Sequence, residues 1–456
     1  MTILDKKMAQ ELLNNGKNHV VIPDFVTEIG ESAFEHCNEL TSFVIPNSVT
    51  KIGNCAFFKC NGVRSVVIPD SVTEIGERAF SCCRKLSSIS VDKNNPRYDS
   101  HGECNAIIET VTNTLIVGCM NTTIPDTVTK IGSDAFAECS ELKSLTIPDS
   151  VTEIKEDAFF HCSGLTSIVI PKSLTKIGSY AFGFCQELTS LFIPDSVTEI
   201  GRTVFYHCDK LQSITVDKNN PRYDSREDCN AIIETATNTL IVGCMNTTIP
   251  DSVTKIGKDA FDHCMELTSV VIPKSVTKIG MDAFAFCEEL TSVVIPNSVT
   301  EIEDGAFSSC NELKSVAIPE SLIEISSNVF FDCEKLRSIA VDKNNPRYDS
   351  RGDCNAIIET VTNTLIKGCS RTIIPDTVTT IGELAFDSCK GLTYVTIPKS
   401  VTKIEEDAFC NCNELKFINI ENSAIQIEKD AFCRCRNISE ESKKRLKELG
   451  YDFDEE

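Results

Sequence analysis

The sequence of 456 residues lacks any long uncharged apolar run, and its basic residues are outnumbered by its acidic ones. Because a membrane-spanning helix needs about 20 consecutive apolar residues, we predict no transmembrane helix. Lys and Arg together number 44 against 67 Asp and Glu, which gives a formal net charge of −23. This charge repels phosphate groups, so we expect neither nucleic acid nor an anionic membrane as the partner.

The first 19 residues lack an uninterrupted apolar core and a small-residue cleavage site, so they do not resemble a secretory signal. We therefore expect a protein that stays inside the cell, or one whose signal has been removed. Residues 1–20 instead predict a capping helix. Thr2 would be its N-cap, Leu4, Met8 and Leu12 would share one face, and Gly16 would end it.

The chain is dominated by an internal repeat of 23 residues. Ile170 begins the unit IPKSLTKIGSYAFGFCQELTSLF, and Ile193 begins the next one. A fixed period of this length predicts a solenoid of stacked turns. The alternation that starts at Leu165 predicts a strand with Ile168 pointing inward. The Ala-Phe-x-x-Cys stretch predicts a single helical turn whose Phe and Cys also point inward.

Three longer units of 33 residues interrupt this rhythm, at about residues 91–123, 216–248 and 341–373. Each contains the loop sequence DKNNPRYDS and then two apolar stretches around a Thr-Asn turn, which predict a β-hairpin. We expect about 14 short and 3 long units in residues 21–438, and a C-terminal capping helix with an acidic tail in residues 439–456. The predicted fold is an α/β solenoid of parallel strands with short helical turns, curved into a horseshoe or right-handed superhelix.

The repeat C-x-x-L-x-x-I-x-I-P-x-x-V-T-x-I-G-x-x-A-F resembles the BspA-like, or Treponema pallidum-type, leucine-rich repeat over about residues 20–438. The resemblance implies a curved α/β solenoid. It also implies a surface or secreted protein of the kind that adheres to host proteins and other cells. The missing signal favours a cytoplasmic location instead, so both locations stay open.

No constellation of side chains in the sequence indicates an enzyme. His36, His161, His207 and His263 each precede a cysteine of the repeat. They recur because the repeat does, and we expect them to project outward while the cysteines point inward. We therefore expect no catalytic residues and no cofactor.

Fourteen of the 24 cysteines share one column of the repeat, from Cys37 to Cys435, which predicts buried free thiols. Cys410, Cys412, Cys433 and Cys435 could together hold zinc. We favour the simpler interpretation, with no metal, because Cys412 and Cys435 belong to the buried column. Three other pairs bracket the hairpins and are either disulfides or buried thiols: Cys104 with Cys119, Cys229 with Cys244, and Cys354 with Cys369.

The outward-facing column of the strands is the best candidate for a binding surface. Its apolar members are Val44, Val67, Val169, Phe192, Val271 and Val294. An apolar stripe rimmed by hydroxyls on a concave sheet is typical of an interaction surface. The alternative is that β-branched residues simply suit a strand.

A second candidate lies in the three inserts, which repeat an Arg-Tyr pair: Arg97 and Tyr98, Arg222 and Tyr223, and Arg347 and Tyr348. Three similar sites could hold a repetitive ligand by avidity. Alternatively, each Tyr covers its hairpin and each Arg solvates the loop.

The sequence thus predicts a monomeric, non-enzymatic binding or adhesion protein that recognises a protein or glycan on its concave sheet. The alternative is an intracellular scaffold or assembly protein that mediates protein–protein interaction.

Overall fold

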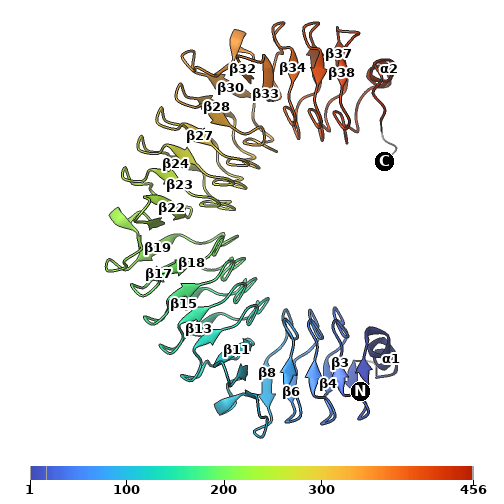
Figure 1. Ribbon diagram of the computed structural model, residues 1–456, viewed down its shortest axis with the longest axis vertical. Coiled ribbons are helices and arrows are strands. Elements are labelled where there is room, and N and C mark those ends of the chain that lie inside the picture. The colour runs from blue at the N-terminus through green and yellow to red at the C-terminus, as the bar shows by residue number, and fades with distance from the viewer. Residues whose placement is uncertain (1, 17, 454–456) are drawn as a thin grey trace. The chain divides into compact units, whose positions relative to one another are not determined.

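The computed structural model of the chain describes residues 2–16 and 18–453. Its contacts divide the chain into two compact units, Met1–Ser225 and Arg226–Glu456. Each unit is a stack of repeated turns (Figure 1). Within the described residues, no helix combines the length and apolar character that a membrane span needs.

Two kinds of strand recur in the 23-residue turns, a longer one before the Ile-Pro pair and a two-residue one in the Thr-x-Ile segment. In the first unit the longer strands are β2 (His19–Val21), β4 (Ser42–Val44), β6 (Ser65–Ile68), β8 (Ser88–Val91), β13 (Ser144–Thr146), β15 (Ser167–Val169), β17 (Ser190–Ile193) and β19 (Ser213–Val216). The shorter ones are β1 (Ile3–Leu4), β3 (Glu28–Ile29), β5 (Lys51–Ile52), β7 (Glu74–Ile75), β12 (Lys130–Ile131), β14 (Glu153–Ile154), β16 (Lys176–Ile177) and β18 (Glu199–Ile200).

The second unit repeats this arrangement. Its longer strands are β24 (Ser269–Val271), β26 (Ser292–Val294), β28 (Ser315–Ile318), β30 (Ser338–Val341), β35 (Tyr394–Ile397) and β37 (Phe417–Ile420). Its shorter strands are β23 (Lys255–Ile256), β25 (Lys278–Ile279), β27 (Glu301–Ile302), β29 (Glu324–Ile325), β34 (Thr380–Ile381), β36 (Lys403–Ile404) and β38 (Gln426–Ile427).

The strands pair in parallel with copies one turn along the chain: the shorter strands form ladders of several turns, and the longer strands form two-stranded sheets. In the longer column Leu145 lies opposite Ile168, and in the shorter column Ile154 lies opposite Ile177. The register equals the repeat length, so identical positions form continuous columns. This arrangement confirms the predicted solenoid of parallel strands.

The long units add a hairpin to the stack, as predicted. The first insert contains β9 (Tyr98–Asp99), the 3-10 turn η1 (His101–Glu103), β10 (Ile107–Glu109) and β11 (Thr114–Val117). The second contains β20 (Tyr223–Asp224) in the first unit, and η2 (Arg226–Asp228), β21 (Ile232–Glu234) and β22 (Thr239–Val242) in the second unit. The third contains β31 (Tyr348–Asp349), η3 (Arg351–Asp353), β32 (Ala356–Glu359) and β33 (Thr364–Gly368).

The hairpin joins the column of shorter strands. β11 is antiparallel to β10 and parallel to β12, with Leu115 opposite Ile131. The preceding ladder, β1-β3-β5-β7, ends at β7, and a new ladder starts with the insert. Each insert therefore interrupts the column of shorter strands and restarts it.

The Ala-Phe-x-x-Cys segment is not a helical turn, contrary to the sequence-based expectation. Asp157, just before it, and His161, within it, have positive φ values of 56° and 61°, and left-handed residues end a right-handed helix. The backbone N–H of Phe159 donates to the carbonyl of Ala181 in the next turn, at 2.8 Å. These hydrogen bonds run between turns, which satisfies backbone groups that an isolated helical turn would leave unpaired.

The core is a stack of phenylalanine rings flanked by the inward Leu, Ile and Val. In the first unit the ring centroids of Phe136 and Phe159 are 5.0 Å apart, and those of Phe159 and Phe182 are 5.3 Å apart. At the insert the ring of Phe136 lies against Gly118, where a Cβ atom would come within 2.2 Å of a ring carbon. The hairpin therefore needs glycine at this position to let the ring pack.

Two α-helices flank the repeats, α1 (Lys6–Gly16) and α2 (Glu440–Glu448). Thr2 is not the N-cap of α1: residues 3–4 form β1, and the Asp5 carboxylate accepts a hydrogen bond from the Met8 N–H at 2.8 Å. β1 pairs with β3, so the first two residues after Thr2 extend the ladder instead of the helix. Ser439 caps α2, because its hydroxyl accepts from the Ser442 N–H.

Candidate binding surface

The predicted apolar stripe lies on the solvent face of the longer strands. In the first unit Val169 is 68% exposed and Phe192 47%, and in the second unit Val271 is 82% exposed and Val294 76%. Val44 and Val67 are also exposed. The intervening side chains, such as Ile168, are buried, as the two-residue period of a strand requires. The structure therefore exposes every residue of the predicted stripe.

The register brings the members of the stripe together within each unit. Val271 lies directly opposite Val294, and Val44 lies opposite Val21. The stripe is broken where polar residues take the same column, since Phe192 lies opposite Thr215. The result is a series of short apolar patches.

Threonine side chains rim these patches. The hydroxyl of Thr166 donates to the backbone carbonyl of Lys143 at 3.1 Å. The hydroxyl of Thr291 donates to the backbone carbonyl of Thr268 at 3.3 Å. Because their protons are used between turns, these hydroxyls can only accept hydrogen bonds from a partner. The surface thus offers aliphatic contact area and hydrogen-bond acceptors.

The Arg-Tyr pairs of the inserts have structural partners inside the fold. Tyr98, Tyr223 and Tyr348 are buried. The guanidinium of Arg97 lies 5.8 Å from the centre of the Tyr98 ring and donates to Glu109 at 2.9 and 3.1 Å. The hydroxyl of Thr112, together with this guanidinium, lowers the pKa of Glu109. The tyrosines cannot contact a partner from the interior, so the surface that we propose below omits them.

An asparagine that the sequence did not single out holds the DKNNPRYDS loop. The side-chain nitrogen of Asn95 donates to the carbonyls of Pro69 and Val72 at 2.7 and 2.9 Å. Its side-chain oxygen accepts from the backbone N–H groups of Arg97 and Tyr98 at 2.9 and 2.8 Å. Asn220 and Asn345 make the same contacts in the other inserts. The signal in the sequence was the second Asn of each DKNNP.

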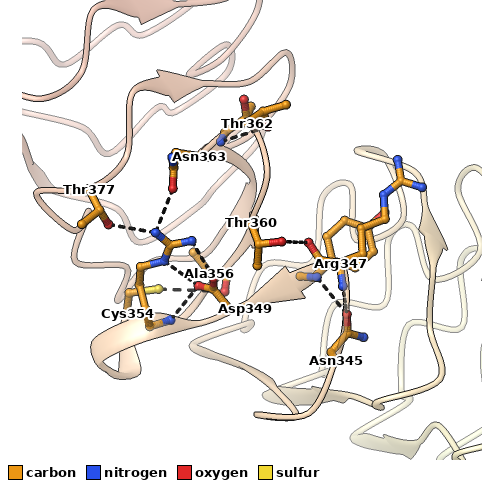
Figure 2. A network of polar contacts seen from close by, with 12 residues as sticks. Asn345, Arg347, Asp349, Cys354, Ala356, Thr360, Thr362, Asn363 and Thr377 are labelled. Atoms are coloured by element: carbon orange, nitrogen blue, oxygen red, sulfur yellow. Dashed lines mark hydrogen bonds and ion pairs between the residues drawn. The ribbon is translucent and has the colours of Figure 1, made fainter.

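In the third insert a second polar side chain, that of Arg351, holds the loop in place. Figure 2 shows its partners Asp349, Asn363 and Thr377. The Arg351 guanidinium pairs with both carboxylate oxygens of Asp349, at 2.8 and 2.6 Å. It also donates to Asn363 at 2.9 Å and to Thr377 at 3.2 Å. Arg351 begins an Arg-Gly-Asp triplet, and these contacts keep its guanidinium from pairing with a carboxylate of another protein.

The cysteines of the repeat column form no disulfide, as predicted, and all but the half-buried Cys37, Cys264 and Cys389 are buried. The Cys162 sulfur donates to the carbonyl of Phe136 at 3.1 Å, and the same bond recurs along the stack. Burial raises the pKa of Cys162 well above its ordinary value. The hairpin pairs are also free: the Cys119 sulfur lies 3.5 Å from the carbonyl of Asn105 and is not bonded to Cys104.

The four-cysteine zinc site is wrong, because its members divide into two pairs. Cys412 and Cys435 lie in the core and donate to the carbonyls of Phe386 and Phe409 at 3.1 and 3.0 Å. Cys410 and Cys433, which belong to neighbouring turns, form a disulfide. Their column directly follows the buried Phe, and Cys410 is buried while Cys433 is half-buried.

The histidines beside the cysteine column have packing partners. The His161 ring stacks on Phe184 with centroids 4.7 Å apart. His263 is buried, contrary to the expected outward orientation, and its Nδ1 lies 2.8 Å from the Asp262 carboxylate. A thiol such as Cys162, held protonated by burial, is a poor nucleophile, so these neighbours do not form an activated Cys–His pair.

The comparisons with known proteins agree with this architecture. The model of the BspA type leucine rich repeat region matches residues 13–113, 117–227, 242–351 and 361–451, in six copies. No curated protein matches the chain. Among solved structures, a leucine-rich cell surface protein from Faecalibacterium prausnitzii is 27% identical, with 92% of this chain and 90% of that chain covered and a TM-score of 0.49.

Two further solved structures are similar. A leucine-rich repeat protein from Bacteroides ovatus is 26% identical, over 74% of this chain and 81% of that chain, with a TM-score of 0.38. The leucine-rich repeat protein of T. pallidum is 20% identical, over 60% of this chain and 84% of that chain, with a TM-score of 0.23. By the extent of the family match, the chain belongs to the BspA-type leucine-rich repeat family.

Proposed function

We propose that the chain is a non-enzymatic binding protein of the adhesion type, and that it recognises a protein partner through the apolar stripe of its longer strands. The observation that carries the proposal is the exposure of Val271 and Val294, 82% and 76%, on directly opposed strand positions. Adjacent exposed apolar side chains rimmed by polar ones are typical of interaction sites. The family supports protein binding in general.

The stripe favours a protein over a glycan, the other class that the sequence left open. Its exposed members are mostly valines, which offer aliphatic area without the flat aromatic faces that stack on rings. Fully burying one valine contributes about 1.5–3 kcal/mol of binding free energy. Association also loses translational, rotational and side-chain freedom, so one buried valine is not enough and several must be buried together. We therefore expect the partner to span several turns.

The test compares Asp substitutions on and off the stripe. Val169, Phe192 and Val271 are changed to Asp together, and the matched control changes Val111 and Val361, which are 81% and 85% exposed at the hairpin tips. Binding of each chain to a panel of immobilised cell-surface proteins and to a glycan array is measured. We expect the stripe variant to lose protein binding at least tenfold and the control to retain it. Equal binding by both variants would place the site elsewhere.

The second candidate function is an intracellular scaffold that uses the same surface. The unpaired hairpin cysteines, such as Cys104 and Cys119, favour it, because thiols stay reduced inside cells. Brief protease treatment of intact cells of the source organism decides between the two. Cleavage of the chain on intact cells supports adhesion, and full protection supports the scaffold.

A further inference from the structure

The disulfide between Cys410 and Cys433 lies beside an acidic side chain of the second unit. The Cys433 sulfur is 3.5 Å from an oxygen of Asp407. The ligand atoms of Asp407, Cys410 and Cys433 all lie within 4.8 Å of one another. A disulfide sulfur carries no proton that it could donate to this carboxylate, so the close contact is better suited to the reduced sulfur or to a cation between the groups.

The sequence places this group where two neighbouring turns share a motif. The turns read DAFCNC and DAFCRC, from Asp407 and from Asp430. In the turn before them the column of Cys410 carries Asp387, which is buried. The side chains of Asp387 and Asp430 line the same cleft as the sulfur pair and Asp407.

The group is reachable from solvent. It lines a cleft of about 950 Å³ that Lys443 and Lys447 of α2 and Tyr451 also line. The Cα atoms of Cys410 and Cys433 are 4.6 Å apart, which is the ordinary spacing of neighbouring strands. The backbone of the stack holds the two cysteines side by side whether or not their sulfurs are bonded.

We propose that the reduced thiolates of Cys410 and Cys433, together with the carboxylate of Asp407, bind one zinc ion, and that oxidation to the disulfide releases it. Two thiolates and one carboxylate match the ligand preference of zinc. Two Zn–S bonds of about 2.3 Å at a tetrahedral angle place the sulfurs about 3.7 Å apart, which side-chain rotation alone can supply at this backbone spacing. Among the described residues the group has these three ligand atoms, so water from the cleft takes the fourth position.

The two states are linked by a two-electron exchange. Oxidised glutathione, a low-molecular-weight disulfide, accepts two electrons and two protons and becomes two thiols. The two cysteine thiolates lose those electrons, form the S–S bond and let the zinc ion leave as Zn²⁺. In the opposite direction a thiol reductant breaks the S–S bond, and zinc binding then displaces the two thiol protons.

The test measures zinc bound by the full chain after reduction with a phosphine and after oxidation with glutathione disulfide. Reductant and oxidant are removed before zinc chloride is added, and the bound metal is quantified by mass spectrometry. We expect one zinc per reduced chain and none per oxidised chain. Cobalt in place of zinc should give a thiolate-to-metal charge-transfer band in the reduced chain only. Equal zinc in both redox states would overturn the proposal.

Matched variants locate the site. C410S and C433S remove ligands, and we expect their zinc affinity to fall more than the 10–100-fold typical of losing an outer-shell partner. D407N should weaken binding while it keeps both thiols. The controls are C37S and D157N. Cys37 is a thiol of the first unit, and Asp157 occupies the column of Asp407 in the first unit without cysteines beside it. Full zinc binding by folded C433S or D407N, judged by circular dichroism, would contradict the assignment.

Discussion

The hydroxyl of Tyr98 accepts a hydrogen bond from the backbone N–H of Ile75 at 2.9 Å. Ile75 is the last residue of β7, which is the edge strand of its ladder. The side chain of the insert thus satisfies a backbone group that would otherwise face the gap between two ladders. In the second unit the hydroxyl of Tyr451 likewise accepts a hydrogen bond from a backbone N–H, that of Phe432, at 3.0 Å.

Replacing Tyr98 by Phe should therefore destabilise the first unit. The Ile75 N–H, which is half-buried, would lose its acceptor, at a cost of about 1 kcal/mol, the low end for a lost partner. Amide hydrogen exchange at Ile75 measures this directly, and we expect it to become faster. Tyr394→Phe is the control, because Tyr394 is 54% exposed. Unchanged exchange at Ile75 in Y98F would show that water replaces the hydroxyl.

The phenylalanine stack should be the most sensitive part of the core. Phe284 is fully buried, with neighbouring ring centroids at 4.8 and 5.2 Å. Phe284→Ala should cost about 3–5 kcal/mol in the free energy of unfolding. The control, Phe286→Ala, removes an exposed ring from the same turn and should cost much less. Urea unfolding followed by circular dichroism makes the comparison, and similar losses for both variants would contradict the role of the stack.

Acidification should stabilise the first unit through Asp157. Burial, with the charges of Asp134 and Glu156, raises the pKa of Asp157 to about 6. A carboxyl whose pKa is higher in the folded than in the unfolded state favours folding when protonated. The stabilisation of the folded state by the protonated Asp157 carboxyl is complete below about pH 4, the ordinary pKa of Asp. This stabilisation is lost as the pH rises through 6.

Asp157→Asn should abolish this contribution. We expect the variant to melt at a higher temperature than the parent chain at pH 7.5, with a smaller difference at pH 5. Asp149→Asn, at an exposed position, is the control and should leave the pH dependence as it is. A D157N chain whose melting temperature changes with pH as much as that of the parent would disprove the role of this carboxyl.

Arg351 should hold the loop of the third insert in place. Its side chain joins Asp349, Asn363 and Thr377, and Arg351→Ala should cost about 1 kcal/mol. Arg351→Lys should not restore the loss, since an ammonium group cannot pair with both carboxylate oxygens and reach the other two partners. The measurement is the rate of protease cleavage between residues 350 and 355, with Arg371→Ala as the control. Equal cleavage rates in R351A and R371A would show that Arg351 does not restrain the loop.

Local patterns were enough to predict the columns of the stack. The alternation around Ile168 indicated which side chains point inward, and the spacing of Phe159 and Cys162 indicated a buried column. The exposure of Val169 and Val271 followed from the same two-residue period. Whether these valines bind a partner stays a prediction.

The features that the sequence patterns alone did not predict depend on contacts between turns. The segment around Phe159 was predicted to be helical because its pattern fits a helix, but the N–H groups of Phe159 and His161 bond to the next turn, and His161 has a positive φ. The sequence left open whether Tyr98 covers its hairpin or faces a partner; it is buried, and its hydroxyl meets the open ladder edge at Ile75, 23 residues earlier. The pairing of Cys410 with Cys433 depends on the stacking of two neighbouring turns.

The sequence by itself determined the repeat, its register and its inward faces, because a constant period forces identical residues into the same column. Only the tertiary structure decided the roles of the residues that break the period. Asn95 and Tyr98 meet their partners across turns, where a side chain is placed by the stacking of the backbone and not by its neighbours in sequence. For the same reason the group of Asp407, Cys410 and Cys433 became visible only once the turns were stacked.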